Sequence, residues 1–274
     1  MMEAVAEHTN EQSAAKAFSA QSGVFDEIYS GNTLINYKRD RVRAHVMEYL
    51  QPNSHILELN SGTGEDAIFF AENGHRVHAT DIAEGMQQKL REKAAKTPFS
   101  AAITTENCSY TQLGALRHTG PYDHIFSNFA GLNCTGELDK VLISLPDLLK
   151  PGGVATLVIL PRFCLWESLL LFKGMFKTAT RRWFSKNGVT AHVEGTYFTC
   201  WYYDPSFVVN AVKDSFEVLS VEGLCTIVPP SYIEHFAERH PKAYRWLKAK
   251  EERYRFGWPW RFIGDYYIIS WRKK

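Results

Sequence analysis

The sequence lacks the cysteine patterns of a zinc protein or a disulfide-stabilised secreted protein. Its five cysteines are widely spaced, and no two form a C-x-x-C pair. That spacing provides no zinc-binding pattern, and an odd count argues against a disulfide framework. We therefore expect reduced thiols, no metal site and a cytoplasmic location.

An excess of charge of one sign is also missing. The chain has 31 Lys and Arg residues against 30 Asp and Glu residues, which gives a net charge of +1. A protein that binds nucleic acid mainly by neutralising phosphates carries a marked basic excess. We therefore expect no nucleic-acid partner.

Long apolar runs are absent as well. The N-terminus is polar, so no signal peptide is expected. The longest apolar run, around Leu165–Phe176, is interrupted by Glu167 and Lys173 and is too short to span a bilayer. We therefore expect no membrane span.

A stretch from His55 to Asp81 has the pattern of a strand, a glycine turn, a helix and a second strand. The turn is Ser61-Gly62-Thr63-Gly64, whose glycines allow a tight backbone turn close to a ligand. Asn73-Gly74 ends the helix, and Asp81 ends the second strand. This βαβ unit predicts a parallel sheet.

The same turn also fits a dinucleotide-binding fold, because Gly62–Ala67 satisfies G-x-G-x-x-G/A and Asp81 follows at the spacing of a ribose-binding acid. Two features argue against a dehydrogenase. Glu58 lies on the first strand, where that fold is usually apolar, and some fifty residues precede the strand. Motifs further along the chain favour another family.

Three segments in order resemble the class I S-adenosylmethionine (SAM)-dependent methyltransferases. Glu58–Gly64 resembles the family's first motif, Tyr122–Phe129 its fourth strand, and Leu148–Gly153 the turn before its fifth strand. Asn60 replaces the motif's first glycine, and Asn tolerates a positive φ. The resemblance implies SAM as cofactor and a doubly wound α/β fold: a seven-stranded, mostly parallel sheet with a helical N-terminal lid.

The order of elements completes this prediction. Helices are expected at Ala14–Ala20, Arg39–Leu50, Ala83–Ala95 and Leu138–Leu149, and strands at Ser100–Glu106, Val154–Leu160, Phe216–Cys225 and Asp265–Trp271. We expect a single domain over residues 1–274, with a core at about 39–160 and 204–274.

Two segments are longer than the family's minimal fold requires. Residues 161–203 are interpreted as a cap inserted after strand five, and their end predicts a hairpin with Gly195 at the turn. Pro229–Phe262 contains a charged, aromatic helical stretch at Tyr232–Tyr254. Long insertions are often lids or binding loops, so we interpret both as the part that selects the substrate.

The resemblance also implies which residues contact the cofactor. Asp81 would accept the two ribose hydroxyls, Glu58 and the glycine turn would surround the amino-acid end, and Asn107 and Cys108 would lie beside the adenine. The full set comprises Tyr29, Tyr37, Glu58, Asn60, Ser61, Gly62, Thr63, Gly64, Asp81, Ile82, Met86, Asn107, Cys108, Ser127, Asn128 and Phe129.

The sequence identifies no catalytic residue. Candidates for a general base are His192, His235, Glu167 and Tyr202, and candidates for an anion clamp are Arg162, Arg181 and Arg182. A structural or solvated role is the better interpretation for most of them. Methyl transfer needs chiefly an in-line arrangement of nucleophile, methyl carbon and sulfur, so no fixed catalytic set is required.

The resulting hypothesis is a SAM-dependent methyltransferase that acts on a small-molecule acceptor. Two alternatives stay open: a protein or RNA methyltransferase, and a partner or sensor that binds SAM or S-adenosylhomocysteine without catalysis. The sequence leaves the acceptor, the attacking atom and the oligomeric state open.

Overall fold

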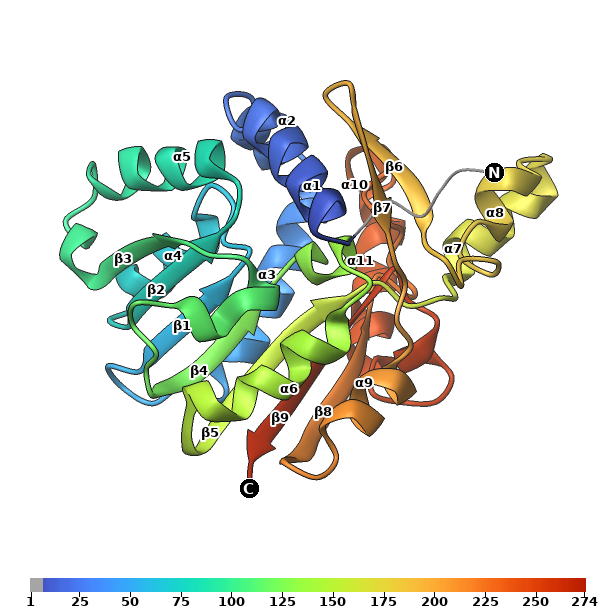
Figure 1. Cartoon of the computed structure of the whole chain (residues 1–274). Coiled ribbons are helices and arrows are strands. Elements are labelled where there is room, and N and C mark those ends of the chain that lie inside the picture. The colour runs from blue at the N-terminus through green and yellow to red at the C-terminus, as the bar shows by residue number, and fades with distance from the viewer. Residues whose placement is uncertain (1–6) are drawn as a thin grey trace.

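The computed structural model of the protein describes residues 7–274. One seven-stranded sheet has the order β3-β2-β1-β4-β5-β9-β8 (Figure 1). Neighbouring strands from β3 to β5 are parallel, whereas β9 is antiparallel to both β5 and β8. The strands are β1 (His55–Leu59), β2 (Arg76–Asp81), β3 (Ile103–Asn107), β4 (Tyr122–Ser127), β5 (Leu149–Ile159), β8 (Phe216–Leu224) and β9 (Tyr266–Lys273). The predicted mostly parallel α/β sheet is confirmed.

Helices cover both faces of this sheet. Consecutive strand residues point to opposite faces, so Ile56 of β1 packs in one apolar cluster and Leu57 in the other. The cluster with Ile56 includes α3 (Thr33–Met47), α4 (Glu65–Glu72) and α5 (Glu84–Ala94). The cluster with Leu57 includes α6 (Leu138–Leu148) and α9 (Pro205–Val212).

The N-terminal region is more helical than predicted. It forms α1 (Glu7–Gln21) and α2 (Phe25–Ser30), and α3 begins at Thr33 rather than Arg39. The side chain of Asn32 accepts hydrogen bonds from the backbone N–H groups of Leu34 and Ile35, at 2.9 and 3.1 Å, and so caps α3. Throughout residues 7–274, every helix is too short or too polar to cross a bilayer.

The two inserted segments lie toward one side of the sheet. The first contains α7 (Leu165–Ser168), α8 (Phe176–Thr180) and a hairpin of β6 (Val189–Val193) and β7 (Thr196–Cys200). Gly195 at the hairpin turn has a φ of 74°, as the turn requires. The predicted hairpin is confirmed.

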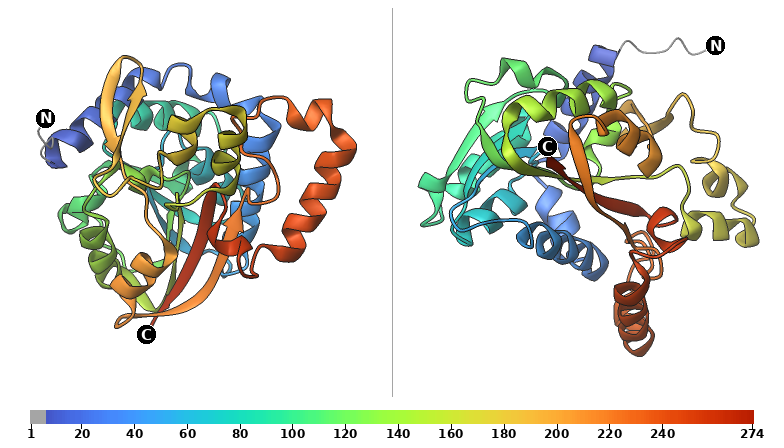
Figure 2. Two further views of the ribbon diagram at one scale, coloured as in Figure 1. Left: turned by 90° about the vertical axis from the view of Figure 1, so that its right-hand side faces the viewer. Right: turned by 90° about the horizontal axis from the view of Figure 1, so that it is seen from below.

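The second insertion differs from the single helix expected at Tyr232–Tyr254. It forms α10 (Phe236–Arg239) and α11 (Pro241–Tyr254). Pro241 supplies no backbone N–H and therefore begins a helix rather than continuing one. Seen from below, α11 stands away from the sheet (Figure 2).

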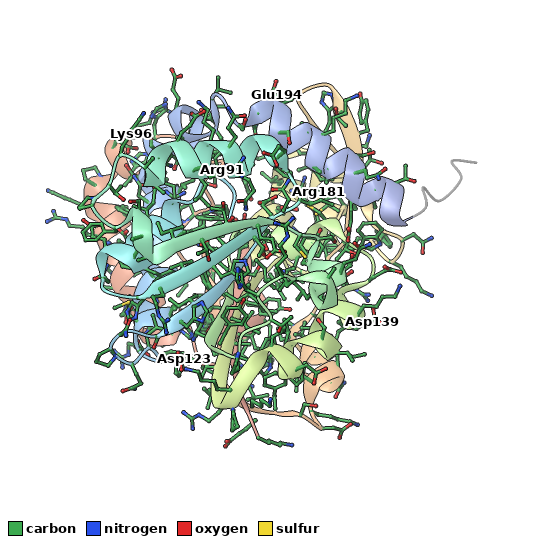
Figure 3. All side chains as sticks on the ribbon, turned by 60° about the vertical axis from the view of Figure 1, so that its left-hand side comes forward. Arg91, Lys96, Asp123, Asp139, Arg181 and Glu194 are labelled. Carbon is green, nitrogen blue, oxygen red and sulfur yellow. The ribbon has the colours of Figure 1, made fainter. Side chains whose placement is uncertain are left out.

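The two ends of the parallel strands have different surroundings. Asp123, near the start of β4, lies at the opposite end of the molecule from Glu194 at the hairpin tip (Figure 3). Its carboxylate accepts from the backbone N–H of His55 and pairs with Lys150. The other end, where the strands finish, is the one over which α1 and the hairpin lie.

Candidate functional site

A cavity lies at the carboxyl ends of the central strands. This is where a doubly wound sheet binds its ligand. The lining residues come from α1, α2 and α3, from β1 and β2, and from the segments that follow β1, β2, β3 and β4. They are Glu11, Ala14, Ala15, Phe18, Phe25, Arg39, Glu58, Asn60, Ser61, Gly62, Thr63, Glu65, Asp66, Asp81, Ile82, Ala83, Met86, Tyr110, Asn128, Phe129, Gly131 and Cys134.

The glycine turn and the acid after β2 are joined directly. Asp81 accepts hydrogen bonds from the backbone N–H of Gly62 at 2.9 Å and of Ala83 at 2.8 Å. Burial raises the pKa of Asp81, although the hydrogen bonds from Ala83 and Gly62 oppose this shift. Gly64 has a φ of 81°, and a Cβ there would collide with the side chain of Leu90. Glycine is therefore needed for α4 and α5 to approach each other.

A buried carboxyl group faces the same cavity from β1. Glu58 is 2% exposed, and its Oε2 has no hydrogen-bond partner among the described residues. Burial and then the nearby Asp66 raise the pKa of Glu58 well above its usual range. Arg39 lies in the same cavity, is also buried, and its Nε lacks a hydrogen-bond partner among the described residues. Two side chains of the cavity wall, one acidic and one basic, thus each carry a buried polar atom without a hydrogen-bond partner among the described residues.

The turn after β4 is held by Asn60. Its Nδ2 donates to the carbonyl of Asn128 at 3.0 Å, and its Oδ1 accepts from Ser127 Oγ at 2.5 Å. Asn60 has a φ of 47°, in agreement with the tolerance expected for the residue in place of glycine. Phe129 and Ala130 also have positive φ values, 48° and 59°. Strained backbone of this kind is often found where a ligand is held.

Helix α1 covers the cavity and is fixed to the cap. Asn10 donates to the carbonyls of Cys134 and Thr199, and it accepts from the backbone N–H of Thr199 at 2.6 Å. Phe18 packs on Phe198 of β7 with ring centroids 5.7 Å apart. Helix α1 and the β6–β7 hairpin therefore form one connected layer over the strand ends.

A second cavity adjoins the first. Phe18, Phe25, Arg39 and Phe129 line both cavities. The remaining walls of the second cavity are Tyr29, Ile35, Lys38, Ser231 and Tyr266. Most of these side chains are aromatic or apolar, two are cationic, and none is acidic.

Lys38 connects the second cavity to a buried ionic network. Its Nζ lies 3.6 Å from Asp265 and donates to Ser231 Oγ at 3.0 Å. Burial alone would lower the pKa of Lys38, but the surroundings, first Tyr266 and then Asp265, outweigh it and the pKa is raised. Lys38 is therefore a cation at the wall of the cavity.

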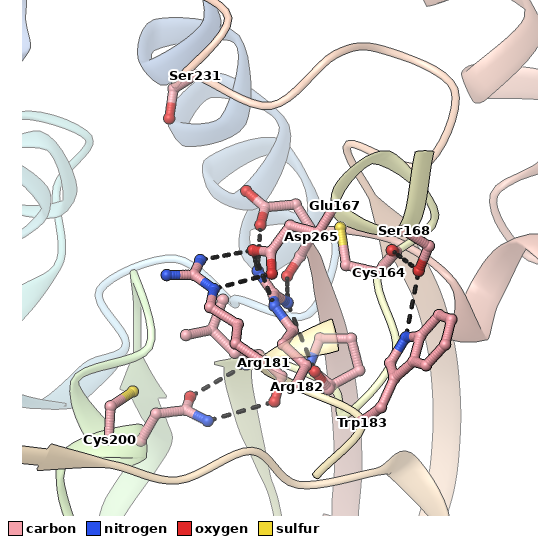
Figure 4. A network of polar contacts seen from close by, with 12 residues as sticks. Cys164, Glu167, Ser168, Arg181, Arg182, Trp183, Cys200, Ser231 and Asp265 are labelled. Carbon is pink, nitrogen blue, oxygen red and sulfur yellow. Dashed lines mark hydrogen bonds and ion pairs between the residues drawn. The ribbon is translucent and has the colours of Figure 1, made fainter. Parts of the chain in front are cut away.

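The network continues into the cap (Figure 4). Arg182 donates to Glu167 at 2.7 Å and to Asp265 at 2.8 Å, and Arg181 donates to Glu167 at 2.7 Å. Cys164, Glu167 and Asp265 also lie close enough together to hold a metal ion. The guanidinium of Arg182 already bonds the carboxylates of Glu167 and Asp265. The positive charge that a metal ion would bring to this cluster is therefore supplied by Arg182.

The structure brings ten of the predicted cofactor contacts to the first cavity. These are Glu58, Asn60, Ser61, Gly62, Thr63, Asp81, Ile82, Met86, Asn128 and Phe129.

The other six do not line the first cavity, and four of them have other hydrogen-bond partners. Tyr37 donates to Glu251 at 3.2 Å and packs toward α11 rather than the cavity. Asn107 donates to the exposed Glu84, and Cys108 turns to backbone carbonyls of the following turn. Ser127 is occupied by its bond to Asn60.

The last two of the six stand beside the site. Gly64 lies behind the turn against Leu90, and Tyr29 lines the second cavity.

Some lining residues had no sequence signal that we recognised. Glu11, Phe18 and Arg39 lie on helices far from the motifs in sequence, and only the folded chain brings them to the strand ends. The apolar face of α1 offered one usable indication, because Ala14 and Phe18 are four residues apart.

The predicted candidate bases line neither cavity. Glu167 is paired with two arginines, and Tyr202 packs against Arg182. His192 stacks on Tyr197 in the hairpin, and His235 precedes α10. The arginines considered as an anion clamp are also engaged, Arg162 with the carbonyl of Tyr202 and the other two with Glu167.

Comparisons with known proteins agree with the site. A family profile described as "Methyltransferase domain" matches residues 56–153. Demethylmenaquinone methyltransferase of Symbiobacterium thermophilum is 30% identical over 109 residues, which cover 38% of this chain and 42% of that protein. The chain covers less than two thirds of the length of the curated relatives that it matches.

Two solved structures resemble the whole chain. The cyclase SpnF superimposes with a TM-score of 0.62 at 14% identity, covering 96% of this chain and 97% of its own. The 1,6-didemethyltoxoflavin-N1-methyltransferase of Burkholderia thailandensis, with its acceptor and S-adenosylhomocysteine bound, gives 0.59 at 14% identity, covering 98% and 91%. These likenesses establish the fold, and the matched profile covers the glycine turn, Asp81 and the strands that carry them. Residues 56–153 therefore match a methyltransferase domain, and the chain resembles the class I SAM-dependent methyltransferases, whose cofactor is S-adenosyl-L-methionine.

Proposed function

We propose that the protein transfers the methyl group of SAM to a small-molecule acceptor bound in the second cavity. The observation that carries the proposal is the junction of the two cavities, which share four lining side chains. A donor in the first cavity and an acceptor in the second would meet beside Phe129. Methyl transfer needs this arrangement, because it depends chiefly on holding the reacting atoms in line.

The first cavity suits the amino-acid end of SAM. That end carries an ammonium and a carboxylate, and the cavity offers a carboxyl oxygen of Glu58 and a guanidinium nitrogen of Arg39 that lack partners among the described residues. A buried polar group without a hydrogen bond costs free energy, so a ligand that pairs with both is favoured. A bound ammonium would also favour the charged form of Glu58.

The remainder of the cofactor would follow the loop after β2. Each oxygen of Asp81 accepts one backbone N–H and keeps a lone pair, so the carboxylate can also accept two ribose hydroxyls. Ile82 and Met86 offer apolar surface next to it for the adenine. SAM supplies a methyl group on a positively charged sulfur, which makes that carbon open to attack.

The second cavity suits a flat, partly apolar acceptor with an electron-rich oxygen or nitrogen. Its aromatic walls match the body of such a molecule. Lys38 is held protonated there, and a nearby cation lowers the pKa of a bound hydroxyl group. Two relatives are named for small acceptors, demethylmenaquinone and 1,6-didemethyltoxoflavin, and this favours a small molecule over a protein or RNA.

The first test is calorimetric binding of S-adenosylhomocysteine. Asp81→Ala should weaken binding by about 1.5–3 kcal/mol, the scale of hydrogen bonds to a charged group, which is roughly 10- to 150-fold. Asp123→Ala is the matched control, because it removes an equally charged side chain that also accepts a backbone N–H at the far end of the sheet. Equal affinity in wild type and Asp81→Ala would remove the ribose assignment.

Turnover is tested by formation of S-adenosylhomocysteine from SAM with a panel of quinols, catechols and hydroxylated nitrogen heterocycles. Lys38→Met should lower kcat/KM for the acceptor while leaving affinity for S-adenosylhomocysteine within about twofold, since Lys38 lines only the second cavity. Tight cofactor binding without turnover on any acceptor would favour the binding-only alternative.

A further inference from the structure

The cap contains a lobe whose polarity is reversed relative to an ordinary protein surface. We define the cap lobe as residues 165–186, which include α7, a 3-10 turn at Leu169–Lys173 and α8. Its buried side chains include the charged Glu167 and Arg182. Its exposed side chains include six large apolar ones: Leu169, Phe172, Met175, Phe176, Trp183 and Phe184.

The degree of exposure sets this lobe apart from scattered surface apolar residues. Phe172 is 88% exposed, Phe184 81% and Phe176 66%. Isolated apolar residues are normal on any surface, but a cluster of large ones marks a contact surface. In the view of Figure 1, α7 and α8 lie at the outer side of the molecule, away from the β1–β4 half of the sheet.

The charges of the lobe indicate what it contacts. From Ser168 to Gly188 the sequence has no Asp or Glu, and it has five Lys and Arg residues: Lys173, Lys177, Arg181, Arg182 and Lys186. All but Arg182 are exposed. The whole chain is nearly neutral, with a net charge of +1, so this basic excess is local.

We propose that the cap lobe docks the protein on an anionic lipid surface. Aromatic and aliphatic side chains that emerge beside lysines and arginines are the combination by which peripheral segments enter the headgroup region of a bilayer. The lobe inserts Phe172, Phe176 and Phe184, and the lysines meet lipid phosphates. A second copy of this chain fits less well, because a twofold contact would set the basic lobe against itself.

The buried network gives the docking surface a fixed relation to the active site. Arg182 joins the lobe to Asp265 (Figure 4). Asp265 also pairs with Lys38 of the second cavity. In addition, the backbone N–H of Leu165 donates to the carbonyl of Ile263 at 2.9 Å. A lobe held in this way keeps the aromatic acceptor cavity at a set position above the lipid surface. This relation rests on the proposed function, whereas lipid docking itself does not.

The test is co-sedimentation of the full chain with vesicles, either of phosphatidylcholine alone or with about one third phosphatidylglycerol. We expect binding to the anionic vesicles that weakens as salt is raised, since exposed charges are screened. The triple variant Phe172→Ser/Phe176→Ser/Phe184→Ser should lose at least tenfold in partition. Lys173→Glu/Lys177→Glu should lose binding to anionic vesicles.

The matched control is Ile143→Ser/Trp258→Ser, which removes apolar side chains of similar exposure, 66% and 81%, outside the lobe. It should partition like the wild type. Equal partition of the triple variant and the wild type, or failure of the wild type to bind anionic vesicles at low salt, overturns the proposal. Light scattering that shows a dimer in the wild type and a monomer in the triple variant also overturns it, in favour of a second copy.

Calorimetry with S-adenosylhomocysteine separates this proposal from the proposed function. The triple variant should bind that ligand as the wild type does, because none of its changed residues lines the first cavity. Vesicle binding without any binding of S-adenosylhomocysteine would refute the proposed function and leave lipid docking in place.

Discussion

The half of the sheet formed by β1 to β4 with its helices, here called the cofactor half, differs from the cap lobe in which side chains are buried and which are exposed. In the cofactor half, Leu57 and Phe70 are fully buried. In the cap lobe, Glu167 and Arg182 are buried while Phe172 and Phe184 are exposed. The cofactor half is stabilised mainly by removal of apolar surface from water. The cap lobe is held by buried ion pairs, and several of its large apolar side chains are exposed at its surface.

If the cap lobe is held by buried ion pairs, the largest expected loss of stability comes from substitution of Arg182. Arg182→Ala should lower the free energy of unfolding by about 3–5 kcal/mol, because it leaves two buried carboxylates, Glu167 and Asp265, with one partner fewer. Urea unfolding followed by circular dichroism measures this change. Arg181→Ala is the matched control: its side chain is 42% exposed, so it should cost about 1 kcal/mol or less. Equal losses in the two variants would show that the buried network does not hold the lobe.

The next largest loss of stability is expected from glycine substitutions in the cofactor half, and these should not change the properties of the cap lobe. Gly64→Ala should cost about 1–3 kcal/mol, since its Cβ would press on Leu90. Gly62→Ala meets no atom within 4 Å and should cost only about 1 kcal/mol, from its positive φ. Thermal unfolding of both variants, with vesicle partition unchanged, would sharpen the comparison. A larger loss for Gly62→Ala would contradict the packing explanation.

The smallest expected effect is at the residue that departs from the family's motif. Asn60→Gly removes two hydrogen bonds, to Asn128 and Ser127, but relieves a residue with a φ of 47°. These terms oppose each other, so the free energy of unfolding should change by less than about 1 kcal/mol. Asn60→Ala loses the bonds and keeps the strain, and should therefore be the less stable of the two. Urea midpoints compare them directly.

The cofactor half could be predicted from sequence because its signals are local. The glycine turn, the acid after β2 and the alternation of β1 each lie within a few residues, and backbone geometry then sets their arrangement. Asp81 and Gly62 are bonded to each other in the structure. Tyr37 shows the limit, because the family resemblance made it a candidate lid residue over the cofactor, whereas its hydroxyl donates to Glu251 on α11.

The structures of the cap and of helix α1 were harder to predict from sequence, because they depend on contacts between distant segments. Arg182 was interpreted as more often solvated than engaged, yet it is 3% exposed between two carboxylates from different elements. No spacing in the chain predicts that Asp265 lies beside Glu167, or that Arg39 and Glu58 line the same cavity. The start of α11 was also missed. Pro241 begins this helix, whereas a single helical stretch was predicted over Tyr232–Tyr254.

The position of β9 has a consequence for how the chain acquires its structure during synthesis. This strand lies between β5 and β8 and bonds to both. A nascent chain that ends before Asp265 leaves open the edges of β5 and β8 that β9 would pair with, and it has no Asp265 for the cap's arginine. Such edges are templates for association with other chains. The seven-stranded sheet can therefore close only after β9 has been synthesised, and until then these edges are open to pairing with another chain.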